Sequence, residues 1–174
     1  MIAIEAARLI RAQGIQPGRT IRVVLFTNEE NGCKGAQAYL KAHSPELPLH
    51  VAALEADAGN GLAKGFRLDL RGQRGASEEA KQSILARLQA ISPMLLDLGA
   101  ASISLGTSEA DVEWLVAKGV PGIAPDQDTS RYFDVHHTWA DTVDKVRPED
   151  LAKNTAVMAV MTYALASGPK LITP

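Results

Sequence analysis

Helical and strand patterns alternate along this chain, and the alternation restricts its possible folds more than any other feature of the sequence. Apolar residues recur at helical spacing in some segments and form short apolar runs in others. Such an alternation is typical of a largely parallel sheet covered by helices. We expect helices at residues 2–14, 34–43, 77–91, 110–118 and 148–166, and strands at 20–26, 49–56, 66–70, 102–105 and 120–124.

One expected strand has an alternating pattern of its own. Phe66, Leu68 and Leu70 alternate with charged residues. Because successive side chains of a strand point to opposite faces, this pattern indicates a strand with one face exposed. We therefore expect residues 66–70 to lie at the edge of the sheet.

Length, charge and composition exclude several classes of protein. A chain of 174 residues, 46% of them hydrophobic, is long enough for one domain with its own core. A formal net charge of -2 provides no basic surface for nucleic acid. No apolar stretch approaches the ~18 residues of a membrane span, and the first residues do not resemble a signal peptide. We expect one domain over residues 1–174 that binds neither nucleic acid nor membrane.

Acidic residues follow the first two expected strands. Glu29 and Glu30 come after the first, and Glu55 and Asp57 lie on one side at the end of the second. Parallel pairing of these strands would bring Asp57 close to Glu29 and Glu30, at the edge where open α/β sheets bind ligands. Converging carboxylates repel one another unless a cation lies among them. The pattern is compatible with a divalent metal site, and also with a solvated rim whose acids cap the following helices.

Two adjacent histidines favour the metal interpretation. In an extended segment His136 and His137 point to opposite faces, so only one can easily join the acids. A neutral imidazole is the usual partner of carboxylates around zinc. His43 and His50 are poor candidates, because His50 begins the strand that Asp57 follows and so belongs to the opposite rim.

Several short motifs, in order along nearly the whole chain, resemble the zinc exopeptidases of the aminopeptidase and glutamate carboxypeptidase family. They are residues 27–32 with Gly35 and Ala36, residues 54–59, residues 119–122 and residues 132–142. The resemblance implies a three-layer α/β sandwich, with a central mixed and mostly parallel sheet flanked by helices and lacking the first elements of that fold. It also implies a metallopeptidase that releases terminal residues from short peptides.

The resemblance assigns roles to five residues. Glu29 matches the general base that takes a proton from a metal-bound water. Glu30 and His137 match two ligands of one zinc ion, and Asp57 matches a ligand of the other. Tyr132 matches a tyrosine that polarises the scissile carbonyl or holds the substrate, although a core aromatic under the loop is the alternative.

The chain also departs from that family. The family pattern includes a histidine and a metal-bridging aspartate upstream of the helix expected at residues 2–14, and we expect residues 1–174 to lack both. Catalytic zinc normally has three protein ligands, so we expect at most one zinc ion, or weak binding. The sheet surface that the absent elements would cover predicts self-association into a homo-oligomer.

Two other functions were considered from the sequence. A non-catalytic binding or oligomerisation module of the same ancestry predicts little bound metal. A flavodoxin-like nucleotide-binding protein is excluded, because two carboxylates occupy the place of a glycine-rich phosphate loop after the first strand.

Overall fold

A four-stranded mixed sheet forms the middle of the computed structural model, which describes residues 1–59 and 61–172. Its strands are β1 (Ala53–Leu54), β2 (Ala63–Asp69), β3 (Ser102–Leu105) and β4 (Gly122–Gln127). They lie in the order β1-β4-β2-β3. β1 is parallel to β4 and β2 is parallel to β3, whereas β2 and β4 are antiparallel. The predicted α/β class with a mixed, mostly parallel sheet is therefore confirmed.

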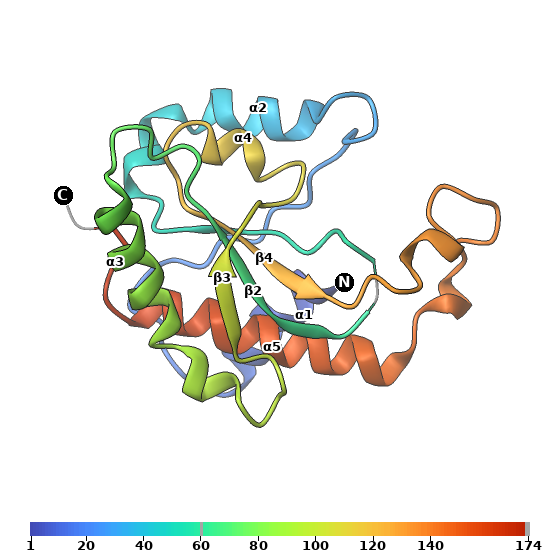
Figure 1. The fold of residues 1–174 in the computed structure, drawn as a ribbon. Helices are drawn as coiled ribbons and strands as arrows, with labels where there is room; N and C mark the ends of the chain where they lie inside the picture. Colours follow the sequence, from blue (N-terminus) through green and yellow to red (C-terminus); the bar gives the residue numbers. More distant parts are fainter. Residues whose placement is uncertain (60, 173–174) are drawn as a thin grey trace.

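Helices cover both faces of the sheet (Figure 1). The helices are α1 (Ile2–Ala12), α2 (Lys34–Ala42), α3 (Glu78–Gln89), α4 (Glu113–Val116) and α5 (Pro148–Ser167). Shorter 3-10 turns lie at Ser44–Leu49, Ser92–Leu95, Tyr132–Asp134 and Val143–Lys145. α1, α3 and α5 contribute to a common core on one face, and α2 packs with α4 on the other. This is the expected three-layer sandwich.

Apolar residues of β2 and α5 form the centre of the core. Phe66 and Leu68 belong to the same buried cluster as Val157 and Met161. α5 begins at Pro148, whose fixed φ suits a first helical turn. No helix of the described residues is long and apolar enough to cross a membrane.

The expectation that residues 66–70 form an edge strand was wrong. β2 lies in the interior of the sheet, between β4 and β3. Its charged side chains are accommodated because each has a partner: Arg67 pairs with Glu109, and Asp69 pairs with Arg71. A central strand can carry charged residues when they are paired on the face opposite the apolar core.

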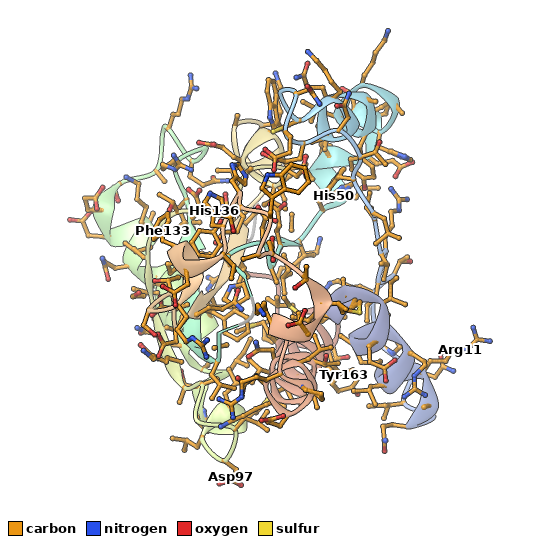
Figure 2. All side chains as sticks on the ribbon, turned by 90° about the vertical axis from the view of Figure 1, so that its right-hand side faces the viewer. Arg11, His50, Asp97, Phe133, His136 and Tyr163 are labelled. Atoms are coloured by element: carbon orange, nitrogen blue, oxygen red, sulfur yellow. The ribbon has the colours of Figure 1, made fainter. Side chains whose placement is uncertain are left out.

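The strand expected at residues 20–26 is absent. No backbone hydrogen bond joins this segment to the other described residues, and Val23 and Leu25 are 38% and 66% exposed. Arg19 holds it to carbonyls at the end of α5, and Arg22 holds it to the region of α2. In Figure 2 the segment leaves α1, on which Arg11 is labelled, and follows one side of the molecule. A strand requires a hydrogen-bonded neighbour, and no described strand pairs with residues 20–26.

Other predicted elements are present with changed boundaries. The helices expected at residues 2–14, 34–43, 77–91 and 148–166 correspond to α1, α2, α3 and α5, and the strand at 102–105 is β3. Of residues 49–56 only Ala53 and Leu54 form a strand, and Leu49 belongs to a 3-10 turn that contains two prolines. The helix expected at 110–118 shortens to α4, and the strand expected at 120–124 becomes β4.

Candidate functional site

A tight turn before α2 carries the paired acids Glu29 and Glu30. Backbone N–H groups of Gly32 and Cys33 both donate to the carbonyl of Glu29 at 2.8 Å. Asn28, Gly32 and Cys33 have positive φ values of 62°, 94° and 52°, so the backbone reverses direction sharply here. As a result Glu29 is half-buried, whereas Glu30 is exposed.

Gly35 allows this turn to close against the preceding segment. A Cβ atom at Gly35 would lie 2.6 Å from both the backbone N and O of Thr27. The N–H of Gly35 donates to the Thr27 carbonyl at 2.9 Å. A larger residue would force the two segments apart, so steric crowding explains why the sequence motif has a glycine at position 35.

Glu30 and His137 lie together, although they are far apart in the chain. Glu30 Oε1 is 3.0 Å from His137 Nε2. Their side chains remain 69% and 62% exposed, respectively. These are the two residues expected to share one metal ion, and their carboxylate and imidazole are donors that zinc prefers. The absence of the strand at residues 20–26 does not prevent the contact, because the turn carrying Glu30 meets the loop carrying His137.

The two histidines do not point to opposite faces, contrary to the expectation for an extended segment. His137 has a left-handed backbone conformation with φ of 55°. The imidazole rings of His136 and His137 are stacked, with centroids 3.9 Å apart and an angle of 23° between their planes. The loop turns through hydrogen bonds from Thr138 to the carbonyl of Val135, which place both rings on the same side.

Tyr132 packs between this loop and the segment after β1. Its ring stacks on His136 with centroids 4.5 Å apart, and a Cβ atom at Gly59 would lie 2.9 Å from Tyr132 Cδ2. Burial raises the pKa of Tyr132, and the charge of Asp57 adds to the increase. Tyr132 is half-buried and not deep in the core. The charges of Glu109, Glu30 and Asp141 also raise its pKa, so the tyrosine lies among acidic residues.

Asp57 is exposed beyond the end of β1. Its charge contributes to the raised pKa values of Glu55, Glu109 and Asp111, for each of which burial is the larger cause. Asp57 is therefore near these acids, but it does not join Glu30 and His137 in a common group of metal ligands. The predicted pairing of the two strands, which would have brought it there, does not occur.

Glu55 connects the end of β1 to the residues just before α4. Its carboxylate accepts hydrogen bonds from the backbone N–H groups of Asp111 at 3.3 Å and Val112 at 2.8 Å. Burial raises its pKa to about 7, although these hydrogen bonds act in the opposite direction. The sequence placed Glu55 beside Asp57, but gave no sign that it would hold the loop before α4.

The loop between β3 and α4 adds two further acids, Glu109 and Asp111, to which the sequence analysis assigned no role. Arg67 pairs with Glu109, and Asp111 is only 5% exposed. One carboxylate oxygen of Asp111 is buried without a hydrogen-bond partner among the described residues. Burial raises the pKa of Asp111, with further contributions from the charges of Glu29 and Asp57. The acidic run after β3 was the available signal for these residues.

His43 and His50 belong to a different network, as expected. Tyr39 Oη lies 3.0 Å from His50 Nε2, and its ring packs on His43. Arg22 donates to the same tyrosine. Both histidines therefore make their contacts around α2.

The described residues fit part of a zinc site. Glu30 and His137 supply two suitable donors at adjoining positions. Among residues 1–59 and 61–172, however, no three His, Cys, Asp or Glu residues are grouped closely enough to hold a metal ion. Because catalytic zinc usually has three protein ligands, this pair needs at least one further donor.

Comparison with known proteins identifies the family. The sequence matches the description Peptidase family M28 over residues 1–162. The chain belongs to peptidase family M28. An M28 peptidase precursor from Shewanella amazonensis has a similar structure, with a TM-score of 0.83 and 37% sequence identity over 99% of this chain and 37% of its own. The α/β fold of this M28 chain agrees with that similarity.

Further relatives of this M28 chain are carboxypeptidases. Carboxypeptidase Q of Homo sapiens is 30% identical over 98% of the chain, and that of Rattus norvegicus is 29% identical over the same share. An aminopeptidase from Aneurinibacillus shares the fold, with a TM-score of 0.62 and 22% identity over 99% of this chain and 40% of its own. The M28 chain spans about a third of the length of the carboxypeptidases, 34% in both.

Proposed function

We propose that this M28 chain forms part of a zinc-dependent exopeptidase that hydrolyses terminal peptide bonds of short peptides. Membership of a peptidase family, together with carboxypeptidase and aminopeptidase relatives, supports a peptidase. The 3.0 Å contact between Glu30 and His137 is the observation on which the metal assignment rests. A bound zinc ion would supply an acidified water and polarise the substrate carbonyl.

The residues of the chain have distinct roles in this proposal. Glu30 and His137 would hold one metal ion, and Asp57 would offer a single carboxylate for a second, which is too few ligands to hold it alone. Glu29, next to Glu30 but half-buried, accepts a proton from the attacking water and delivers it to the leaving amine. Tyr132 directs its hydroxyl toward the scissile carbonyl. Each metal ion would need at least one further donor besides these residues.

Zinc content and hydrolysis, measured together, test this function. The purified chain is dialysed, its zinc is quantified by mass spectrometry, and a dipeptide panel is assayed with and without added Zn²⁺. We expect Glu29→Gln to retain zinc and to lower hydrolysis by roughly 10²–10⁴-fold, the usual contribution of a general base. Glu78→Gln, which alters an exposed acid on α3, is the matched control. Hydrolysis that is unchanged by Glu29→Gln would eliminate the proposed base.

A second candidate function is a binding or oligomerisation module of the same family. Two observations favour it: the described residues contain no three-ligand group, and residues 20–26 are unpaired with Leu25 exposed. An unpaired apolar segment is a ready site for a partner, so we propose that the chain forms a homo-oligomer. Analytical ultracentrifugation at micromolar concentration tests this. We expect Leu25→Ser to reduce the association, and a monomeric wild-type chain would exclude it.

A further inference from the structure

The rings of Tyr132, His136 and His137 form a continuous stack that ends at Glu30. Tyr132 and His136 are 4.5 Å apart between centroids, with 28° between their planes, and His136 and His137 are 3.9 Å apart with 23°. His137 Nε2 then lies 3.0 Å from Glu30. His136 is the central ring of this stack.

The outer ring of the stack has few other restraints. The side chain of His137 is 62% exposed. Its contact with Glu30 is also exposed, and such a contact contributes little free energy to holding a side chain in place. An exposed side chain normally exchanges among its staggered rotamers. The ring of His136, lying flat against one face of His137, is the rigid surface that opposes this exchange.

His136 is itself well fixed. It is half-buried, Tyr132 covers one face, and Phe133 meets it edge-on with centroids 5.7 Å apart and planes at 88°. Figure 2 shows Phe133 and His136 beside each other on the side of the molecule that faces the viewer. Tyr132 is held in turn by its close approach to Gly59. Both ring faces of His136 are therefore used for packing.

We propose that His136 is a positioning residue, which fixes the rotamer of His137 by ring stacking so that Nε2 faces Glu30. The left-handed backbone at His137 has a role in this arrangement, because it places the two rings on one side instead of on opposite faces. The consequence for metal binding rests on the proposed function, but the orientation of His137 does not. The flat ring of His136 performs this role, and its nitrogen atoms do not.

Nuclear magnetic resonance of the whole chain tests the orientation without a metal. Three-bond couplings from the His137 ring carbon to the backbone nitrogen and carbonyl report whether its χ1 angle holds one rotamer or averages. The variants are His136→Ala, His136→Leu, which fills the space without a flat ring, and His136→Phe, which restores one. Thermal unfolding of each variant shows that the fold is retained.

We expect a single χ1 rotamer of His137 in the wild type and in His136→Phe, and averaged couplings in His136→Ala and His136→Leu. In a parallel titration with Zn²⁺ alone, we expect the last two variants to bind roughly two- to tenfold more weakly, as lost ring stacking implies. A single rotamer in His136→Leu, or averaging in the wild type, would overturn the inference. If the wild type does not respond to Zn²⁺, the metal assignment fails, while the couplings still decide the role of His136.

Discussion

Two hydrogen bonds join Asp69 to Ser108 and fix the loop after β3 against the end of β2. The backbone N–H and the hydroxyl of Ser108 both donate to Asp69 Oδ2 at 2.9 Å. Asp69 is completely buried and also pairs with Arg71. Burial by itself would raise the pKa of Asp69, but the hydrogen bonds from Arg71 and Ser108 outweigh it and lower the pKa to about 2. This connection positions the loop that carries Glu109 and Asp111.

Removing the charge of Asp69 is expected to destabilise the folded chain. We expect Asp69→Asn to reduce the free energy of unfolding by about 2–3 kcal/mol, because Arg71 and Ser108 lose a buried ionised acceptor. Urea unfolding followed by circular dichroism measures the change. Asp97→Asn is the matched control: Asp97 is exposed and lies at the lower edge of the molecule in Figure 2. A loss of the same size in both variants would contradict a specific role for Asp69.

The raised pKa of Glu55 predicts how stability depends on pH. Its pKa is about 7 in the folded chain against an ordinary value of 4.5, so the folded state binds the proton more tightly. The contribution of Glu55 to the free energy of unfolding is fully present below pH 4.5, and it is lost as the pH rises toward 7. We expect a loss of about 1–2 kcal/mol, allowing for solvent screening of a partly exposed group.

Comparison with Glu55→Gln isolates this contribution, because the glutamine side chain does not titrate. The free energy of unfolding of the wild type, minus that of the variant, should decrease as the pH rises from 4.5 to about 7. A difference that does not change with pH would show that Glu55 titrates normally.

The unpaired segment at residues 20–26 should exchange its amide hydrogens quickly. No backbone hydrogen bond joins it to the other described residues, whereas β2 is paired on both sides. In a sample dilute enough to keep the chain monomeric, we expect amides of residues 21–26 to exchange at least about 10³-fold faster than those of residues 65–68, because exchange in a central strand requires a large opening. Hydrogen exchange followed by mass spectrometry measures this. Equal protection of the two segments in this monomeric sample would contradict the unpaired state of residues 20–26.

The contact between Glu30 and His137 should matter for metal binding much more than for folding. Both side chains are largely exposed, so we expect Glu30→Gln to change the free energy of unfolding by less than about 0.5 kcal/mol. The same variant should lose most of its affinity for Zn²⁺, measured by calorimetric titration. Glu78→Gln removes a comparable exposed pair with Lys81 and should leave Zn²⁺ binding unchanged. Equal Zn²⁺ affinity in both variants would remove Glu30 from the proposed ligands.

Local patterns predicted most of the helices. α3 begins after Ser77, whose hydroxyl accepts a hydrogen bond from Ala80 N, and α5 begins at Pro148. These signals act over one helical turn, and a single sequence contains them directly. The family motifs also indicated that Glu30 and His137 belong together, and the two side chains do lie in contact.

Strand pairing was harder to predict, because it depends on residues distant in the chain. The alternation in residues 66–70 was compatible with an edge strand, and only the partners Glu109 and Arg71 show how a central strand carries these charges. Residues 20–26 have the composition of a strand, but no described strand pairs with them. Strand propensity reflects packing against neighbours more than a preference of the backbone itself.

The sequence by itself determined the alternation of elements, the helix starts and the residue types available for chemistry, because these depend on neighbours within a few positions. The tertiary structure alone decided which acids converge, how Glu55 and Asp69 hold the loop before α4, and that His136 stacks on His137. The last point depends on one left-handed residue at position 137, which reverses the side-chain alternation expected of an extended segment. Such a conformation is maintained by the surrounding contacts, and these exist only once the chain has folded.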